Sequence, residues 1–266
     1  MFRTDYHLHT NASSDSEAPA ETMIERAIDL GLNEIALTDH VDFDDRYTYT
    51  NYNEYIPKFI SLQEKYKDKI HIALGVEIGL DNMVADTVNA FALSFPFDFI
   101  IGSSHSVKKY DLYYDRKEFF SLFNSKKKAY NCYFEEMIKN IKTCHTFNVY
   151  GHMDFVNRYG TYSDNSLDYA DYKELVDTAL SLLIEKGKGI EINTSGFRYG
   201  LGQTHPSMDF VKRYKELGGE IITTGSDAHR PEDAAKDFDT AYEMLKEAGF
   251  KYITTFRYQK PVFVKL

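Results

Sequence analysis

The chain has 266 residues, of which 43% are hydrophobic and 27% charged, proportions that are ordinary for a soluble globular protein and argue against a disordered or fibrous chain. Its 31 basic and 41 acidic residues leave a net charge of −10, which argues against a protein that coats nucleic acid by neutralising phosphates. The same charge is compatible with a small phosphate-bearing substrate, because arginines or a metal ion can reverse the field inside a cleft. No Pro/Gly/Ser-rich linker or break in composition divides the chain, so we expect residues 1–266 to form a single domain.

The two cysteines, Cys132 and Cys144, match neither a zinc motif nor a redox pair. So few cysteines in a chain of this length favour a reducing compartment. No apolar run approaches the roughly 18 residues that span a bilayer, and the first motif begins at His7, which leaves no room for a cleavable signal peptide before it. We therefore expect a cytoplasmic protein without a membrane partner.

Apolar, β-branched runs alternate with helix-like segments along the chain. The runs predict strands at 5–9, 34–39, 69–78, 98–102, 148–152, 189–193 and 220–225, and we interpret 251–255 as a short eighth strand. The first amphipathic segment carries Met23, Ile24, Ala27 and Ile28 on one face and predicts a helix that ends before Gly31. Further helices are predicted at 53–67, 83–93, 116–145, 168–186, 206–217 and 232–248.

This alternation of strand and helix is typical of parallel βα units. The length of the repeating unit is close to that of a (β/α) barrel. A doubly wound open sheet would show the same alternation, so the periodicity leaves both architectures open.

Polar residues gather where the predicted strands end, and six of the nine histidines lie there. In a barrel the carboxyl ends of parallel strands meet at one mouth, and residues two apart on a strand share a face. His7 and His9 are therefore expected to point into the mouth together, as are Asp227 and His229. The strand-end segments are YHLHT at 6–10, LTDH at 37–40, GVEIG at 75–79, GSSHS at 102–106, YGHMD at 150–154, IEIN at 190–193 and TGSDAH at 224–229.

Most of these segments also have an ordinary structural explanation. A His-x-His pair is often structural, the segment 38–40 suits a helix N-cap and turn, and Asp227 with His229 would fit a simple hydrogen-bonded pair. Glu77 differs, because a carboxylate inside an apolar strand is costly unless it is paired or metal-bound. Imidazoles and carboxylates without a thiolate are a ligand set for Zn, Mn and Fe. Taken together, these residues predict a multinuclear metal site.

In order and spacing the motifs resemble the PHP (polymerase and histidinol phosphatase) family, from residue 5 to about residue 233. The segments 103–106, 151–158 and 193–198 are most similar to the stand-alone histidinol-phosphate phosphatases of that family. The resemblance implies an α/β fold, a distorted (β/α)7 barrel, with three divalent transition-metal ions (Zn, Mn and/or Fe) at the carboxyl ends of its strands. Glu77 would be the bridging carboxylate, and Asp15 stands one residue later than in the commonest family pattern. The implied ligands are His7, His9, Asp15, His40, Glu77, His105, His152, Asp227 and His229.

The resemblance implies a phosphatase that hydrolyses L-histidinol phosphate to L-histidinol and phosphate in histidine biosynthesis. A hydroxide shared by two metals would attack the phosphorus, and Asp227, His229 and Glu77 would be the catalytic residues. Asp227 and His229 are also the nearest candidates for protonating the leaving alkoxide, but both are needed as ligands, which leaves the general acid unassigned. The partner is then a small phosphate monoester, with no nucleic acid.

Two alternatives remain open at the level of the sequence. One is a phosphoesterase that acts on nucleotides or other small phosphate esters. The other is a barrel that uses its metals structurally, although structural metal sites are typically closed and rich in thiolates.

Arg158 and Arg198 follow the fifth and sixth predicted strands. They are candidates for binding the substrate phosphate, because a guanidinium matches phosphate oxygens bidentately; a surface salt bridge is the alternative for each. His205, in a loop before a predicted helix, is a further substrate-binding candidate. The tyrosine-rich segment 46–55 predicts either a wall over the cleft or an aromatic cluster under a long loop.

Overall fold

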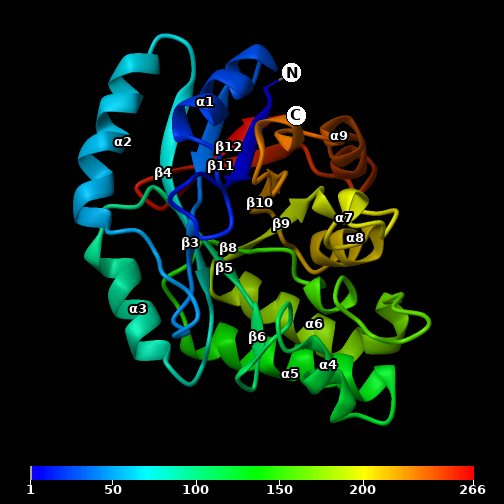
Figure 1. Ribbon diagram of the computed structural model, residues 1–266. Coiled ribbons are helices and arrows are strands. Elements are labelled where there is room, and N and C mark those ends of the chain that lie inside the picture. The colour runs from blue at the N-terminus through cyan, green and yellow to red at the C-terminus, as the bar shows by residue number, and fades with distance from the viewer. Residues whose placement is uncertain (1) are drawn as a thin grey trace.

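The computed structural model describes residues 2–266, and at its centre is a curved sheet of parallel strands with helices on its outer side (Figure 1). The short strand β3 (His40–Val41) continues along β4 beyond the end of β2. The seven main strands follow one another in the order β1 (Thr4–Leu8), β2 (Glu34–Leu37), β4 (His71–Gly79), β5 (Phe99–Ser103), β8 (Val149–Tyr150), β9 (Gly189–Asn193) and β10 (Ile222–Gly225).

The last strand of this sheet returns to the first. Asp227, just after β10, donates its N–H to the carbonyl of His7 at 2.9 Å, and His9 donates to the carbonyl of Ala228 at 2.9 Å. These bonds join β10 to β1 in parallel. The expected distorted seven-stranded barrel is thereby confirmed, and the open doubly wound sheet is not the architecture of this chain.

Helices connect successive strands and cover the outside of the barrel (Figure 1). Helix α1 turns Met23, Ile24 and Ala27 inward, as predicted, and ends before Gly31, whose φ of +71° is in the left-handed region that favours glycine. The long helices are α1 (Ala20–Asp29), α2 (Tyr52–Tyr66), α3 (Ala85–Ser94), α5 (Lys126–Thr143), α6 (Tyr169–Glu185), α8 (Met208–Glu216) and α9 (Phe238–Glu247).

The predicted helix at 116–145 is two helices, α4 (Arg116–Ser121) and α5. The side chain of Ser125 accepts a hydrogen bond from the N–H of Lys128 and so begins a new helix. The prediction of one helix was wrong because apolar periodicity continues across this break.

The predicted eighth strand is present but lies outside the barrel sheet. It is β11 (Tyr252–Arg257), which pairs antiparallel with β12 (Lys260–Lys265). Phe256 of β11 packs against Tyr6 and Phe99, with ring centres 6.4 and 4.9 Å away. The hairpin therefore covers the amino-terminal end of the barrel, opposite the mouth.

Inside the barrel a small apolar cluster gives way to polar residues towards the mouth. On β4 the inward position Ala73 is followed four residues later by Glu77, and on β5 Ile101 is followed two residues later by Ser103, which donates to Glu77 at 2.6 Å. The register of β1 shifts between Asp5 and Leu8, and such a bulge can re-aim side chains. The cluster consists of Tyr6, Ala36, Ala73, Phe99, Ile101, Val149 and Phe256.

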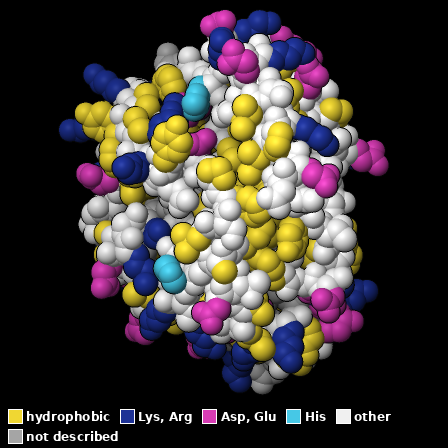
Figure 2. Space-filling model, turned by 90° about the vertical axis from the view of Figure 1, so that its left-hand side faces the viewer, with side chains coloured by type: hydrophobic (Ala, Val, Ile, Leu, Met, Phe, Trp, Pro, Cys, Tyr) yellow, Lys and Arg dark blue, Asp and Glu magenta, His cyan; other side chains and the backbone are white. Residues whose placement is uncertain are grey.

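The outer surface over α2 and α3 differs from the mouth. Figure 2 shows apolar side chains gathered over the middle of this face and charged ones towards its periphery. Ile60 of α2 and Leu93 of α3 are among the exposed apolar residues. None of the helices within residues 2–266 combines the length and the apolar character that crossing a bilayer requires.

Candidate metal centre and cleft

The structure brings all nine predicted ligands together at the mouth of the barrel. His7 lies in the last part of β1, His9 follows that strand directly, and Asp15 lies in the turn after it. The other ligands lie near or just after the carboxyl ends of later strands. Four overlapping triads place one donor atom of each member within 4.8 Å of the others: His9/His40/His229, His7/Glu77/His152, His7/His9/Asp227 and His40/Glu77/His105.

Glu77 is the centre of this cluster and is fully buried. Burial by itself would raise its pKa, but His7, His40 and His105 outweigh burial and hold the pKa of Glu77 well below its usual value. The Glu77 oxygens lie between 2.8 and 3.6 Å from a nitrogen of each of five histidines: His7, His9, His40, His105 and His152.

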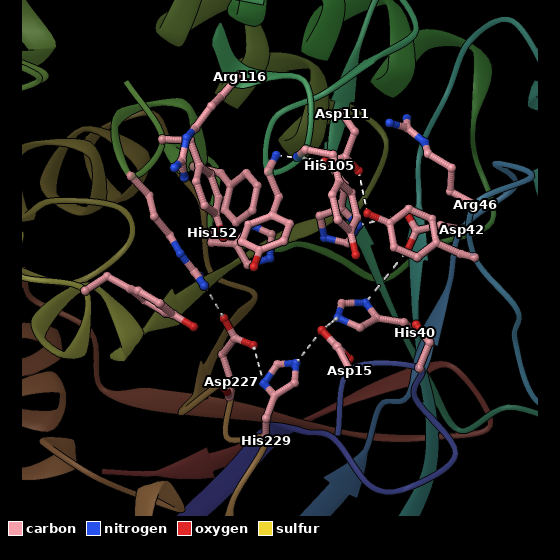
Figure 3. A pocket seen from close by; sticks show the side chains of 18 of the residues that line it. Asp15, His40, Asp42, Arg46, His105, Asp111, Arg116, His152, Asp227 and His229 are labelled. Atoms are coloured by element: carbon pink, nitrogen blue, oxygen red, sulfur yellow. Dashed lines mark hydrogen bonds and ion pairs between the residues drawn. The ribbon is translucent and has the colours of Figure 1, made fainter. Parts of the chain in front are cut away.

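Asp15 reaches the cluster in spite of its late position in the motif. Its Oδ2 lies 3.1 Å from Nε2 of His229 and 3.5 Å from Nε2 of His40, and Figure 3 shows it between these two rings. Because Asp15 belongs to a turn and not to a strand, a shift of one residue does not reverse the direction of its side chain.

The donor atoms at the centre of the cluster fit a divalent metal. His7 Nε2, His9 Nε2, His40 Nδ1 and Glu77 Oε2 are buried and form no hydrogen bond of normal geometry among residues 2–266, although the His7 and His40 nitrogens lie 3.1 and 3.0 Å from Glu77 Oε2. Buried polar atoms are normally hydrogen-bonded or bound to an ion. Imidazole and carboxylate donors suit Zn, Mn and Fe, so the residues present match the metals that the sequence predicts.

Two of the candidate ligands have an unusual backbone. Asp227 has a φ of +53° and His152 a φ of +23°, both in the left-handed region that non-glycine residues rarely adopt. Such strain persists only where surrounding contacts enforce it, commonly at functional sites. Around Asp227, Arg198 Nη2 donates to the carbonyl of Asp227 at 2.8 Å, and Ser195 Oγ donates to its carboxylate at 3.2 Å.

A layer of residues behind the cluster orients the histidines. His7 Nδ1 lies 2.6 Å from Glu191 Oε1, and His105 Nδ1 lies 2.9 Å from Asp42 Oδ1. In each case the opposite ring nitrogen is left facing Glu77, as expected for a ligand held by an outer hydrogen bond. A Cβ at Gly225 would collide with Glu191 and His7, so this contact requires glycine there. The sequence carried a signal for Glu191, since it is a carboxylate inside an apolar strand, as Glu77 is.

Replacing Glu191 with glutamine is expected to weaken metal binding by about 10–100-fold, because the carboxylate no longer fixes and polarises the His7 ring. Competition with a chromophoric chelator measures this affinity. Glu174→Gln, an exposed position on α6, is the control and should leave the affinity unchanged. Equal affinities of the Glu191 variant and the wild type would contradict the orienting role.

Metal binding is also expected to release protons. Burial lowers the pKa of a histidine, but neighbouring carboxylates outweigh it at His7 and His40, whose pKa values lie well above normal, and at His105, where Asp42 and Glu77 raise the pKa to about 10. These rings carry protons in the metal-free protein at neutral pH, and a metal must displace them. Zinc affinity should therefore increase with pH, by up to about tenfold per pH unit for each proton released. A pH-independent affinity, measured between about pH 6 and 8, would contradict this.

A cavity of about 980 Å³ opens above the cluster. Its floor includes His40, His105, His152, Asp227 and His229, and loops from several strands form its walls (Figure 3). The volume is in the range of small-ligand sites, about 300–1,000 Å³.

Arg158 lies on one wall of this cavity and is held firmly. Its side chain is 9% exposed, and its Nη1 lies 3.5 Å from Asp227 Oδ2. The guanidinium carbon is 3.1 Å from the centre of the Tyr199 ring and 5.1 Å from that of Tyr159. Arg158 is therefore no surface salt bridge, and the structure presents it to the cleft beside a candidate ligand.

Arg198 and His205 are placed differently. Arg198 lines the cavity, but it donates to the carbonyls of Ser226 and Asp227. His205 is fully buried behind the cleft, where its ring is hydrogen-bonded to Asp154. The structure does not bring His205 to the cavity wall.

Several residues of the cavity were missed by sequence reasoning. Arg116 begins α4 and lines the cavity, as do Tyr113 and Tyr114 before it. The segment 46–55 was expected to form either a wall over the cleft or a buried aromatic cluster, and it does both in part. Tyr47 and Tyr49 line the cavity, whereas Tyr52 is buried in the core.

Comparison with known proteins identifies relatives of this arrangement. The PHP domain family matches residues 5–195. The chain is 35% identical to a histidinol-phosphatase of Lactococcus lactis over 258 residues, 96% of this chain and 95% of the relative, and 31% identical to a probable histidinol-phosphatase of Clostridium acetobutylicum, over 93% and 94%. The crystal structure of the Lactococcus lactis histidinol phosphate phosphatase, complexed with Zn, L-histidinol and phosphate, matches with a TM-score of 0.91 at 34% identity, covering 98% of each chain. A putative histidinol phosphatase of Listeria monocytogenes shares the fold, with a TM-score of 0.80 at 18% identity over 90% of this chain and 99% of that one.

Proposed function

This chain belongs to the PHP domain family, and we propose that it is a metal-dependent phosphatase that hydrolyses L-histidinol phosphate to L-histidinol and phosphate, a step of histidine biosynthesis. The observation that carries the proposal is the group of buried histidine and glutamate atoms that converge without forming regular hydrogen bonds, below a cleft with arginine on its wall. The 35% identity to a histidinol-phosphatase over nearly the full length of both chains supports the choice of substrate.

Three divalent transition-metal ions (Zn, Mn and/or Fe) are proposed for the site. Glu77 would hold two of them, because its two oxygens face different histidines. Asp15, His40 and His229 would take part in holding another. When bound, such ions supply a nucleophilic water at neutral pH and neutralise charge on the phosphoryl group.

The side chains of the wall would handle the substrate. Arg158 would bind the phosphate, since two parallel N–H groups match two phosphate oxygens and the surrounding rings hold it in place. Arg198 also lines the cavity and is proposed as a second phosphate contact, in addition to its bonds to the carbonyls at 226 and 227. Asp227, His229 and Glu77 are proposed as the catalytic set; Asp227 lies 3.5 Å from Arg158 and 3.6 Å from His229, between the phosphate-binding arginine and the ligand cluster.

Domain organisation, cellular location and the kind of partner complete the proposal. We propose a single domain over residues 1–266, supported by the packing of Phe256 inside the barrel, and a cytoplasmic location, supported by the two free, buried cysteines. The partner is a small phosphate monoester; the net charge of −10 argues against nucleic acid.

Phosphate release by the metal-loaded protein tests the function. We expect kcat/KM above about 10⁴ M⁻¹ s⁻¹ for L-histidinol phosphate, much lower values for generic monoesters and nucleotides, and loss of activity on chelation with recovery on adding Zn or Mn. Comparable slow rates on every ester would refute histidinol phosphate as the substrate, and faster hydrolysis of a nucleotide would favour the nucleotide phosphoesterase instead.

A further inference from the structure

One side of the cleft is built from tyrosines. Tyr47, Tyr49, Tyr113 and Tyr114, which we call the tyrosine wall, all line the cavity. The first two come from the segment between β3 and α2, and the other two from the segment between β7 (Tyr110–Asp111) and α4. Tyr49, Tyr113 and Tyr114 are 45%, 56% and 59% exposed. Folding therefore leaves much of this aromatic surface uncovered within a concave site, where a ligand can cover it.

A single buried carboxylate organises the tyrosine wall. Asp111 is 2% exposed, and it accepts hydrogen bonds from the hydroxyl of Tyr47 at 2.6 Å and from the N–H groups of Tyr113 and Tyr114 at 2.7 and 2.8 Å. It thereby ties together two segments that are 64 residues apart. The tyrosine wall is in this way positioned before any ligand binds, which lowers the entropy cost of binding.

The rings of the wall are also fixed by one another. Tyr113 stands edge-on to Tyr114, with ring centres 4.8 Å apart at 77°, and edge-on to Tyr159, at 5.7 Å and 78°. Arg46, the cation next to Tyr47, is paired with Asp44 at 2.6 Å and with Asp115 at 2.7 Å. Its positive charge is therefore compensated by carboxylates.

The chemistry of the cleft thus changes from the Arg158 enclosure to the tyrosine wall, which adjoin where Tyr113 packs against Tyr159. Asp111, behind the tyrosine wall, lies across the cleft from Asp227, beside which Arg158 ends (Figure 3). The Arg158 side suits a phosphate. Aromatic faces suit flat heterocycles and cations, by stacking and by cation–π attraction.

We infer that the tyrosine wall, with Tyr113 and Tyr114 at its centre, binds the imidazole-bearing end of the substrate and so determines specificity. This rests on the proposed function, in which the phosphate lies over the ligand cluster near Arg158. Beyond its phosphate, L-histidinol phosphate carries a planar imidazole, and the tyrosine wall offers aromatic faces to that ring.

The test compares two substrates that differ in the imidazole. L-histidinol phosphate and 2-aminoethyl phosphate both carry a phosphate and an ammonium group, but only the first has the ring. Tyr113→Leu and Tyr114→Leu should each lower kcat/KM for L-histidinol phosphate about fivefold, chiefly through KM, since an aromatic contact with the imidazole contributes about 1 kcal/mol. Rates with 2-aminoethyl phosphate should stay within about twofold of the wild type. Inhibition by the product L-histidinol should weaken by the same factors as kcat/KM.

Controls separate this inference from general damage. Both tyrosines are more than half exposed, so replacement by leucine leaves the core intact. Tyr252→Leu, at an exposed position on β11, is the control and should leave kcat/KM unchanged for both substrates. If the tyrosine variants lowered kcat/KM equally for both substrates, or for neither, the inference would be overturned while the phosphatase function would stand. A wild-type protein inactive on L-histidinol phosphate but active on AMP, with a loss on AMP in Tyr113→Leu, would overturn both the function and the imidazole subsite.

Discussion

Replacing Glu77 with glutamine is expected to remove both bound metal and activity, lowering kcat/KM by about 10²–10⁴-fold. The Glu77 carboxylate is fully buried and approaches five histidine nitrogens within 3.6 Å. Glutamine has nearly the same shape but no charge, so it leaves the surrounding cations and any bound ion without their common counter-charge. Breaking a buried charge pair in this way costs about 3–5 kcal/mol, and each 1.4 kcal/mol is a factor of ten.

Metal content per protein and kcat/KM, measured on the same preparation, check this expectation. The matched control is Glu34→Gln, because Glu34 is also a buried strand glutamate but lies at the opposite end of the barrel, bound to Arg257. This control should lower stability and leave the metal content unchanged. Full turnover by Glu77→Gln would refute the shared metal cluster.

Replacing Arg158 with methionine is expected to lower kcat/KM about 10²–10³-fold while the metal content stays constant, as for removal of one preorganised donor to a developing charge. The side chain is 9% exposed and is enclosed by the rings of Phe155, Tyr159 and Tyr199. Methionine fills the apolar part of this enclosure, so the loss reports the guanidinium itself. Arg158→Lys should recover only part of the rate, because an ammonium cannot bind two phosphate oxygens in parallel.

The control for Arg158 is Arg213→Met, which breaks a partly exposed ion pair with Asp177 far from the mouth. It should leave kcat/KM unchanged. If Arg158→Met kept wild-type kinetics, Arg158 would be only a neighbour of Asp227. A simultaneous loss of metal would instead show that Arg158 maintains the shape of the ligand cluster.

The strands and the polar residues at their ends were accessible from the sequence because their signals are local, whereas the choice of a barrel over an open sheet and the full ligand set came from the resemblance to the PHP family. A strand such as β4 is buried on both faces, so its apolar run is visible in the chain, and Glu77 is conspicuous inside it. His7 and His9 share a face because alternate residues on a strand do. The parallel arrangement then brings the strand ends together, and the structure places the predicted ligands there.

Other features carried a weaker signal or none. The break between α4 and α5 depends on one capping side chain, Ser125, and the pairing of β11 with β12 depends on a turn that an apolar pattern does not specify. His205 has the residue type of a site histidine, yet it is buried against Asp154. Residue type alone does not distinguish a histidine that faces the cleft from one that is buried behind it.

By itself, the sequence determined the residue types that can hold metal and the strand ends that carry them, because backbone periodicity and parallel topology act over short stretches of chain. Only the tertiary structure decided which loops face one another across the cleft. The tyrosine wall exists because Asp111 bonds to Tyr47, 64 residues away, and Arg158 faces the site because rings from separate segments enclose it. Contacts between distant loops leave no period in the sequence, since each depends on packing that forms only when the barrel closes.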